Sequence, residues 1–165
     1  MSFRLALLVA VALALSGCHR RKATTLERDQ AANLVSEAEF ATTMKEWGRA
    51  EGLYSKALAL CPESGDTWMD LGVVRMRLND HQGARSAYKS ALEAYDDAID
   101  LNPDNSQLVV RKAFALVILG RADQARSALE EALKRLPDDR RLRRFADDHQ
   151  LDAMIADPAL KGVSP

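Results

Sequence analysis

Residues 65–105, GDTWMDLGVVRMRLNDHQGARSAYKSALEAYDDAIDLNPDN, decide the fold of this chain. Two small residues, Gly72 and Ala84, allow two antiparallel helices to approach closely, and the large side chains of Trp68 and Tyr88 fill the seam between them. Pro103 ends the second helix, because proline cannot continue the backbone hydrogen bonding of a helix. The stretch therefore predicts a pair of packed helices, and no strand alternation of any length is found along the sequence.

The same pattern of large and small residues repeats on both sides of this stretch, in the blocks 31–64 and 106–139. The corresponding residues are Leu34, Ala38, Ala50, Tyr54, Ala57 and Pro62 in the first block, and Val109, Ala113, Ala125, Leu129, Ala132 and Pro137 in the third. This pattern resembles the tetratricopeptide repeat, which is built from pairs of antiparallel helices. The resemblance implies an all-α, right-handed α-solenoid of three helix pairs, over residues 31–64, 65–105 and 106–139.

The middle repeat contains seven additional residues, so that Pro103 comes seven positions later than the pattern requires. Tyr88 is echoed by Tyr95, and either tyrosine could fill the aromatic position of the repeat. Seven residues are nearly two helical turns and rotate the apolar face by only about 20°. We therefore expect one extended second helix over residues 82–101. A helix broken near Glu93 is the alternative, but no glycine or proline interrupts the run.

Three polar residues stand where the repeat usually has apolar ones. Glu37 and Lys112 occupy the seventh position of their blocks, which is usually leucine, and Arg75 occupies the eleventh position of the second block. We expect them to weaken the packing of individual helices without changing the fold.

Residues 140–165 are predicted to form a capping helix and a tail, because a solenoid must cover the apolar surface of its last repeat. The residues expected on the inner side of this helix are Leu142, Phe145, Ala146, Leu151 and Ile155. A basic cluster surrounds its start and consists of Lys134, Arg135, Arg140, Arg141, Arg143 and Arg144. The cluster is either a solvated surface or a docking patch for an acidic partner.

Residues 1–17 are predicted to be a signal peptide, because Arg4 precedes an apolar run over 5–15 that is too short to span a membrane. The motif LSGC at 15–18 resembles the lipobox of bacterial lipoproteins. The resemblance implies cleavage before Cys18 and attachment of lipid, palmitate included, to this residue. An ordinary secretory signal with an incidental cysteine is the alternative.

Residues 18–30 are predicted to be a lipidated tether, whose polar part reaches about 40 Å when fully extended. Its basic residues over 19–22 either contact anionic lipid headgroups or are solvated. The residue after Cys18 is His19 and not the aspartate that retains some lipoproteins in the inner membrane. We therefore expect a lipid-anchored protein of the bacterial cell envelope, in the outer membrane and facing the periplasm.

The composition and the motifs give no indication of catalysis. The formal net charge is -1, which does not favour nucleic acid as a partner. The histidines at 19, 81 and 149 have no ligand-spaced neighbour, and no phosphate-binding loop or nucleophile motif is present. Cys61 is interpreted as a structural thiol. We expect no enzymatic activity, no cofactor and no metal site.

In tetratricopeptide domains the first helix of each repeat lines a concave face, and the resemblance places a set of residues on that face. The predicted partner-binding residues are Val35, Met69, Asp70, Val73, Met76, Val110, Arg111, Phe114 and Val117. Most of them are apolar, which suits an amphipathic helix or hydrophobic segment of a partner protein. The basic residues with which some family members grip an acidic carboxyl-terminal tail are missing from the first two repeats. The C-terminal helix or a second copy of the chain could also fill this face.

These features together predict a membrane-anchored protein–protein interaction module. Its plan is similar to that of pilotin-like and outer-membrane assembly lipoproteins with tetratricopeptide repeats, which suggests an envelope assembly or scaffold factor. The alternative is a permanent structural subunit of an envelope complex, and homo-oligomerisation is compatible with either function. The sequence does not name the protein or peptide partner.

Overall fold

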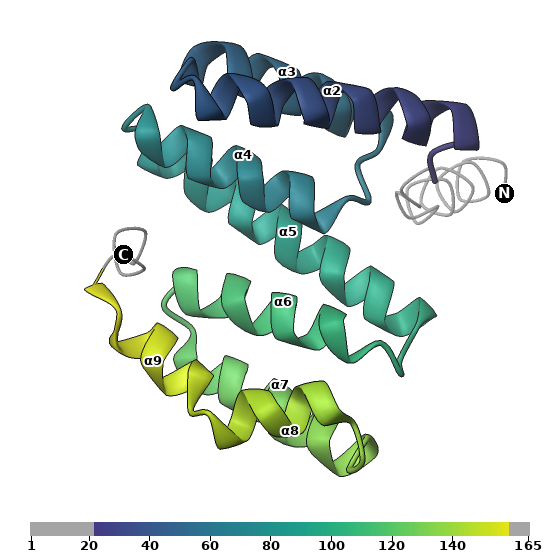
Figure 1. Ribbon diagram of the computed structural model, residues 1–165, viewed down its shortest axis with the longest axis vertical. Coiled ribbons are helices and arrows are strands. Elements are labelled where there is room, and N and C mark those ends of the chain that lie inside the picture. The colour runs from purple at the N-terminus through teal and green to yellow at the C-terminus, as the bar shows by residue number, and fades with distance from the viewer. Residues whose placement is uncertain (1–21, 159–165) are drawn as a thin grey trace, which may run out of the picture.

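The computed structural model describes residues 22–158, and this part of the chain consists of helices and their connections, without a strand. Its helices are α2 Thr25–Thr43, α3 Trp47–Leu60, α4 Gly65–Arg77, α5 His81–Leu101, α6 Ser106–Ile118, α7 Ala122–Arg135, α8 Arg140–Asp147 and α9 Gln150–Ala156. The pairs α2–α3, α4–α5 and α6–α7 stack on one another, and α8 and α9 close the far end (Figure 1). The predicted all-α solenoid of three helix pairs with a C-terminal cap is confirmed. The predicted signal peptide and Cys18 lie outside the described residues.

The first helix that the structure describes, α2, begins at Thr25, inside the segment predicted to be a tether. Thr24 and Glu27 form a capping box: the Thr24 Oγ1 accepts from the Glu27 N–H at 3.3 Å, and a Glu27 carboxylate oxygen accepts from the Thr24 N–H at 2.8 Å. The Ala23 N–H donates to Glu63 Oε1 at 3.0 Å, so the chain is fixed one residue before the cap. The prediction that the tether extends to residue 30 is therefore wrong.

The two echoing tyrosines of α5 pack against two glycines of α4. A Cβ atom at Gly72 would overlap the ring of Tyr88, and a Cβ atom at Gly65 would overlap the ring of Tyr95. Tyr88 therefore occupies the place that the repeat pattern gives to its aromatic residue, and Tyr95 covers the start of α4. The helix α5 is continuous over His81–Leu101, as predicted, and its C-terminal end extends past the start of α4 (Figure 1).

The contact between Gly72 and Tyr88 predicts that Gly72→Ala lowers the free energy of unfolding by about 1–3 kcal/mol, because the added methyl group must displace an aromatic ring within a tightly packed core. Chemical unfolding monitored by circular dichroism measures the change.

Gly52→Ala is the matched control for this prediction, since nothing lies within 4 Å of a Cβ atom at that helical position. It should raise the stability by up to about 1 kcal/mol through the helix propensity of alanine. Equal stabilisation by both substitutions would contradict the close contact between α4 and α5.

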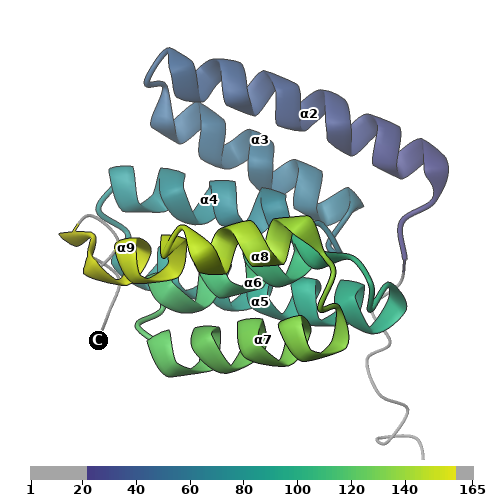
Figure 2. The ribbon, with the colours of Figure 1, turned by 60° about the horizontal axis from the view of Figure 1, so that its bottom comes forward.

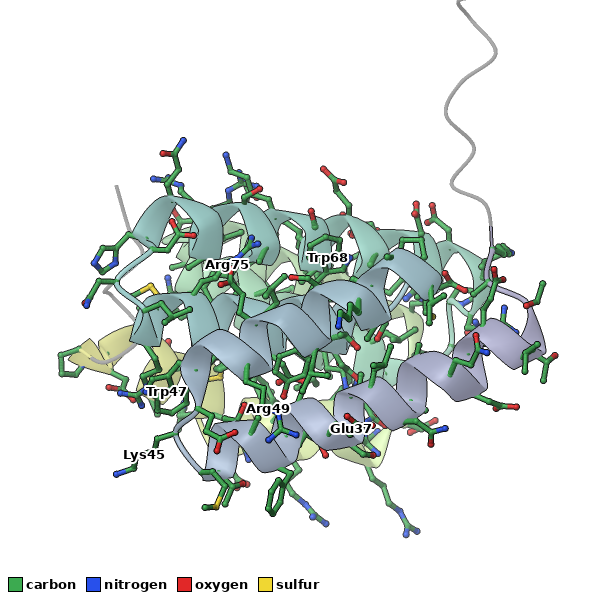
Figure 3. All side chains as sticks on the ribbon, turned by 90° about the horizontal axis from the view of Figure 1, so that it is seen from above. Glu37, Lys45, Trp47, Arg49, Trp68 and Arg75 are labelled. Carbon is green, nitrogen blue, oxygen red and sulfur yellow. The ribbon has the colours of Figure 1, made fainter. Side chains whose placement is uncertain are left out.

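The polar residues that depart from the repeat pattern are accommodated individually. Arg75 lies on α4 (Figure 3). Its Nε forms an ion pair with Glu51 Oε1 on α3 at 2.9 Å, and its guanidinium also donates to the Gly83 carbonyl at the start of α5. Lys112 Nζ lies 2.6 Å from the Asp96 carboxylate on α5. Glu37 is exposed on α2, the first helix that the structure describes (Figure 3). These arrangements replace apolar packing by ion pairs or by solvation.

The cap consists of two short helices where one was predicted. The helix is interrupted at His149, whose φ of 50° lies in the left-handed region. Leu142 on α8 and Leu151 on α9 are both buried. In one continuous helix these two leucines, nine positions apart, would point about 180° away from each other, so the break allows both to face the core. Ala146 is exposed, and its predicted place on the inner side is wrong.

Candidate functional site

A pocket of about 400 Å³ opens between α4, α5, α6 and α9, and we call it the inner pocket. It is lined by Asp66, Met69, Asp70, Tyr95, Val110, Arg111, Phe114 and Met154. Five of the residues predicted to bind a partner, Met69, Asp70, Val110, Arg111 and Phe114, are thus brought together from α4 and α6.

The apolar wall of the inner pocket follows from the helical register of α4 and α6. Val110 and Phe114 are four positions apart on α6, so their side chains lie on the same face of that helix. Phe114 is 36% exposed although it is a large aromatic residue, whereas Met69 on α4 is buried and forms part of the core. The pocket therefore presents an accessible aromatic ring above a packed floor.

The charged groups of the inner pocket are only partly neutralised. Arg111 forms an ion pair with Asp66, and the Tyr95 hydroxyl donates to Asp66 Oδ1 at 2.7 Å. Asp70 is half-buried and has no ion pair or hydrogen bond through its carboxylate within residues 22–158. Desolvation, together with the nearby Glu39 carboxylate, raises the pKa of Asp70 to about 6. The α4 side of the pocket thus carries an uncompensated negative charge at neutral pH.

The raised pKa of Asp70 predicts that Asp70→Asn stabilises the fold at pH 7 by about 1–2 kcal/mol, a value reduced to allow for the partial solvation of this carboxylate. An acid whose pKa is higher in the folded state destabilises the fold when it is charged. This penalty grows as the pH rises from about 4, the ordinary value for aspartate, to about 6, and it is complete above that. The gain from Asn should therefore be present at pH 7 and absent below pH 4 in thermal or urea unfolding.

Asp97→Asn is the control for this pH dependence, because Asp97 is exposed on α5 and does not line the pocket. It should change the stability by less than about 0.5 kcal/mol. A gain from Asp70→Asn that stays constant between pH 3 and pH 7 would contradict the desolvation of this carboxylate.

The other predicted partner-binding residues lie outside the lining of the inner pocket. Val73 is 43% exposed on α4. Val35 and Met76 are half-buried against the core. Val117 is only 8% exposed and belongs to the core of the last repeat, where α8 and α9 pack against α6. Val117 is therefore not accessible to a partner.

Three lining residues, Asp66, Tyr95 and Met154, were not predicted from the sequence. Asp66 is at the second position of its block, which the repeat pattern places on the concave face. Tyr95 is the second of the two echoing tyrosines, and it reaches the pocket because it covers the start of α4. Met154 comes from α9, and only the break at His149 brings it here.

Other sites of chemistry were sought in the described part of the chain. Within residues 22–158, no group of three or more histidine, cysteine or acidic side chains is arranged to hold a metal ion. Cys61 is a free, half-buried thiol, and burial and the neighbouring Glu63 raise its pKa. None of the helices over these residues is both long enough and apolar enough to cross a membrane.

Two models of tetratricopeptide repeats match the sequence, one over residues 44–99 and the other over residues 84–146. Together the two matches span more than half of the chain, and they agree with the stacked helix pairs of the structure. Residues 44–146 are therefore tetratricopeptide repeats.

Several solved structures are similar to this chain at low sequence identity. The first repeat domain of Spaghetti (RPAP3), bound to the HSP90 peptide SRMEEVD, is 16% identical with a TM-score of 0.48, over 79% of this chain and 98% of that one. The chaperone SycD of Yersinia enterocolitica type III secretion, in complex with a peptide of the translocator YopD, is 17% identical with a TM-score of 0.47, over 84% and 97%. The Sgt2 repeat domain from Aspergillus fumigatus is 18% identical with a TM-score of 0.47, over 90% and 91%. No curated protein matches the sequence significantly.

Proposed function

We propose that this protein is a membrane-anchored protein–protein interaction module that binds a segment of a partner protein in the inner pocket. The observation that carries the proposal is the exposed Phe114 ring in the lining of a pocket of about 400 Å³. Exposed aromatic side chains beside a well-packed apolar floor are the usual anchors of protein interfaces. Tetratricopeptide repeats typically serve as interaction scaffolds, which supports the same function.

The chemistry of the pocket favours an apolar partner segment. Met69, Val110, Phe114 and Met154 supply apolar surface, and methionine side chains adapt to differently shaped ligands. The Arg111–Asp66 ion pair at the rim leaves little free positive charge inside the pocket. An amphipathic helix or a hydrophobic stretch therefore fits the inner pocket better than an isolated acidic tail does.

The proposal includes the anchor and the location. Lipid on Cys18 would hold the repeats at the bacterial cell envelope, in the outer membrane and facing the periplasm. Because Ala23 is already fixed to Glu63, the chain between Cys18 and Ala23 spans at most about 18 Å. A domain held so close to a membrane would present its pocket to envelope proteins, as an assembly or scaffold factor does.

A permanent structural subunit, with the pocket filled by its own chain or by a second copy, is the alternative. Met154 favours it, because α9 of the same chain already borders one side of the inner pocket. The accessible Phe114 ring favours an external segment.

Photo-crosslinking in membranes of cells that produce the full chain tests the proposal. Val73 is exposed on α4, about one turn from the lining residues Met69 and Asp70. A photoreactive amino acid at this position should crosslink to one envelope protein that mass spectrometry identifies. The same amino acid at Lys89, exposed on α5 away from the pocket lining, should not. A crosslink to a second copy of the chain would support the structural subunit, and no crosslink from Val73 would contradict the proposed function.

A further inference from the structure

A second pocket adjoins the inner pocket, and we call it the arginine pocket. It has a volume of about 490 Å³ and is lined by Val110, Arg140, Arg141, Arg144, Phe145 and Gln150. Val110 lines both pockets, so the two are neighbours along α6. The cap forms the other wall of each, because α8 and α9 follow one another along the side of α6 (Figure 2).

The structure divides the five arginines of the basic cluster around α8 into two groups. Arg135 donates to the Pro103 carbonyl at 2.7 Å, and Arg143 forms an ion pair with Asp138 at 2.6 Å and donates to the Pro137 carbonyl. These two arginines hold loops of their own chain. The guanidinium groups of the three arginines that line the pocket have no hydrogen bond or ion pair within residues 22–158.

The register of α8 places Arg140, Arg141 and Arg144 on one side of the helix. Arg140 and Arg144 are four positions apart, and Arg141 and Arg144 are three apart. The Asp139 carboxylate accepts the backbone N–H groups of Arg141 and Leu142 at 2.9 Å, and its charge also interacts with the Arg141 guanidinium. Asp139 therefore offsets part of the charge of Arg141, and Arg140 and Arg144 keep the arginine pocket positive.

The two pockets carry opposite charge at their outer ends. Asp70 and Glu39 make the α4 side of the inner pocket negative, since neither forms an ion pair within the described part of the chain. A segment with an acidic end can therefore enter with that end toward α8 but not toward α4, because like charges at close range cost binding energy.

We propose that the arginine pocket binds carboxylate side chains of the same partner segment whose apolar part occupies the inner pocket. This inference rests on the proposed function. The partner is then a protein segment in which an apolar stretch is followed by two or more acidic residues. Guanidinium groups suit carboxylates because they can donate two parallel hydrogen bonds. The Val110 and Phe145 side chains in the wall continue the apolar surface of the inner pocket, which favours a protein segment over an anionic lipid surface.

Fluorescence anisotropy with the full chain in neutral detergent tests the inference. The probes are a fluorescein-labelled peptide with an alternating leucine–alanine run followed by three aspartates, and the same peptide with asparagines in their place. The acidic peptide should bind at least about tenfold more tightly in low salt, and salt should weaken this preference. The double variant Arg140→Gln, Arg144→Gln should bind both peptides with the affinity of the neutral one.

Arg121→Gln is the matched control, because Arg121 is exposed at the start of α7 and does not line either pocket. This variant should keep the preference for the acidic peptide. Equal binding of both peptides to the unmodified chain would overturn the role of the arginine pocket and leave the proposed function standing. Binding of neither peptide would count against both. Vesicles of phosphatidylglycerol that displace the acidic peptide from the arginine pocket would overturn the inference in favour of a lipid headgroup site.

Discussion

Phe114→Glu is expected to lower the yield of the partner crosslinked at Val73 by about 30-fold or more. Phe114 is the accessible aromatic residue of the inner pocket and the proposed anchor of the partner, and the loss of such an anchor commonly costs about 2 kcal/mol or more of binding free energy. The new carboxylate would also stand in the pocket that already contains Asp66 and Asp70. The measurement is the amount of crosslinked partner recovered from membranes at equal expression.

The same variant should remain folded, because a side chain that is 36% exposed contributes little to the buried core. Phe40→Glu is its matched control: Phe40 is 61% exposed on α2 and lies outside both pockets, so this variant should keep the crosslink. A loss of stability by several kcal/mol in Phe114→Glu would instead indicate that the chain itself fills the pocket. Loss of the partner in Phe40→Glu alone would move the binding surface to α2.

The repeat architecture could be predicted because it depends on short-range packing rules. Small residues such as Gly72 and Ala84 mark where helices approach, and prolines mark where they end, so the phase of the repeats follows from spacing alone. The helices α4 and α6 begin at Gly65 and Ser106, the first residues of the second and third blocks. The spacing could not predict how the polar residues that depart from the repeat pattern are accommodated, because the ion pair of Arg75 with Glu51 joins residues on different helices.

The repeat pattern alone did not decide between Tyr88 and Tyr95 for its aromatic position. The sequence contains two tyrosines seven positions apart on α5, and it also contains two glycines seven positions apart on α4. In an antiparallel pair these residues oppose each other as Gly72 with Tyr88 and Gly65 with Tyr95. A comparison of the two spacings would have predicted that Tyr95 lies at the start of α4, where it lines the inner pocket.

The inaccessible Val117 and the divided cap required knowledge of tertiary packing. Position within the repeat assigns Val117 to the concave face, but the cap packs against α6 and buries its last turn. The break at His149 could have been expected from Leu142 and Leu151, because one straight helix cannot direct both toward the core. The break also moves Met154 to the inner pocket, so the shape of the candidate site depends on a cap geometry that local propensity does not define.

Cys18→Ser is expected to abolish labelling of the protein by a palmitate analogue and to remove it from the outer membrane. The thiol of Cys18 is the proposed attachment atom, and serine offers no thiol for the lipid. Two or more acyl chains give stable membrane anchoring, so their loss should change the distribution of the protein almost completely. The variant should accumulate either in soluble form or as the uncleaved precursor, and fractionation combined with metabolic labelling measures both.

Cys61→Ser is the matched control, because it removes the other cysteine of the chain, a half-buried thiol that follows α3. This variant should keep both the label and the membrane location, although it also replaces a sulfur atom by an oxygen atom. The pair of variants separates lipidation at the lipobox from nonspecific acylation of an accessible thiol. Label that persists in Cys18→Ser and disappears in Cys61→Ser would contradict lipidation at the lipobox and favour an ordinary secretory signal with an incidental cysteine. The repeats would then act without the proposed short tether to the membrane.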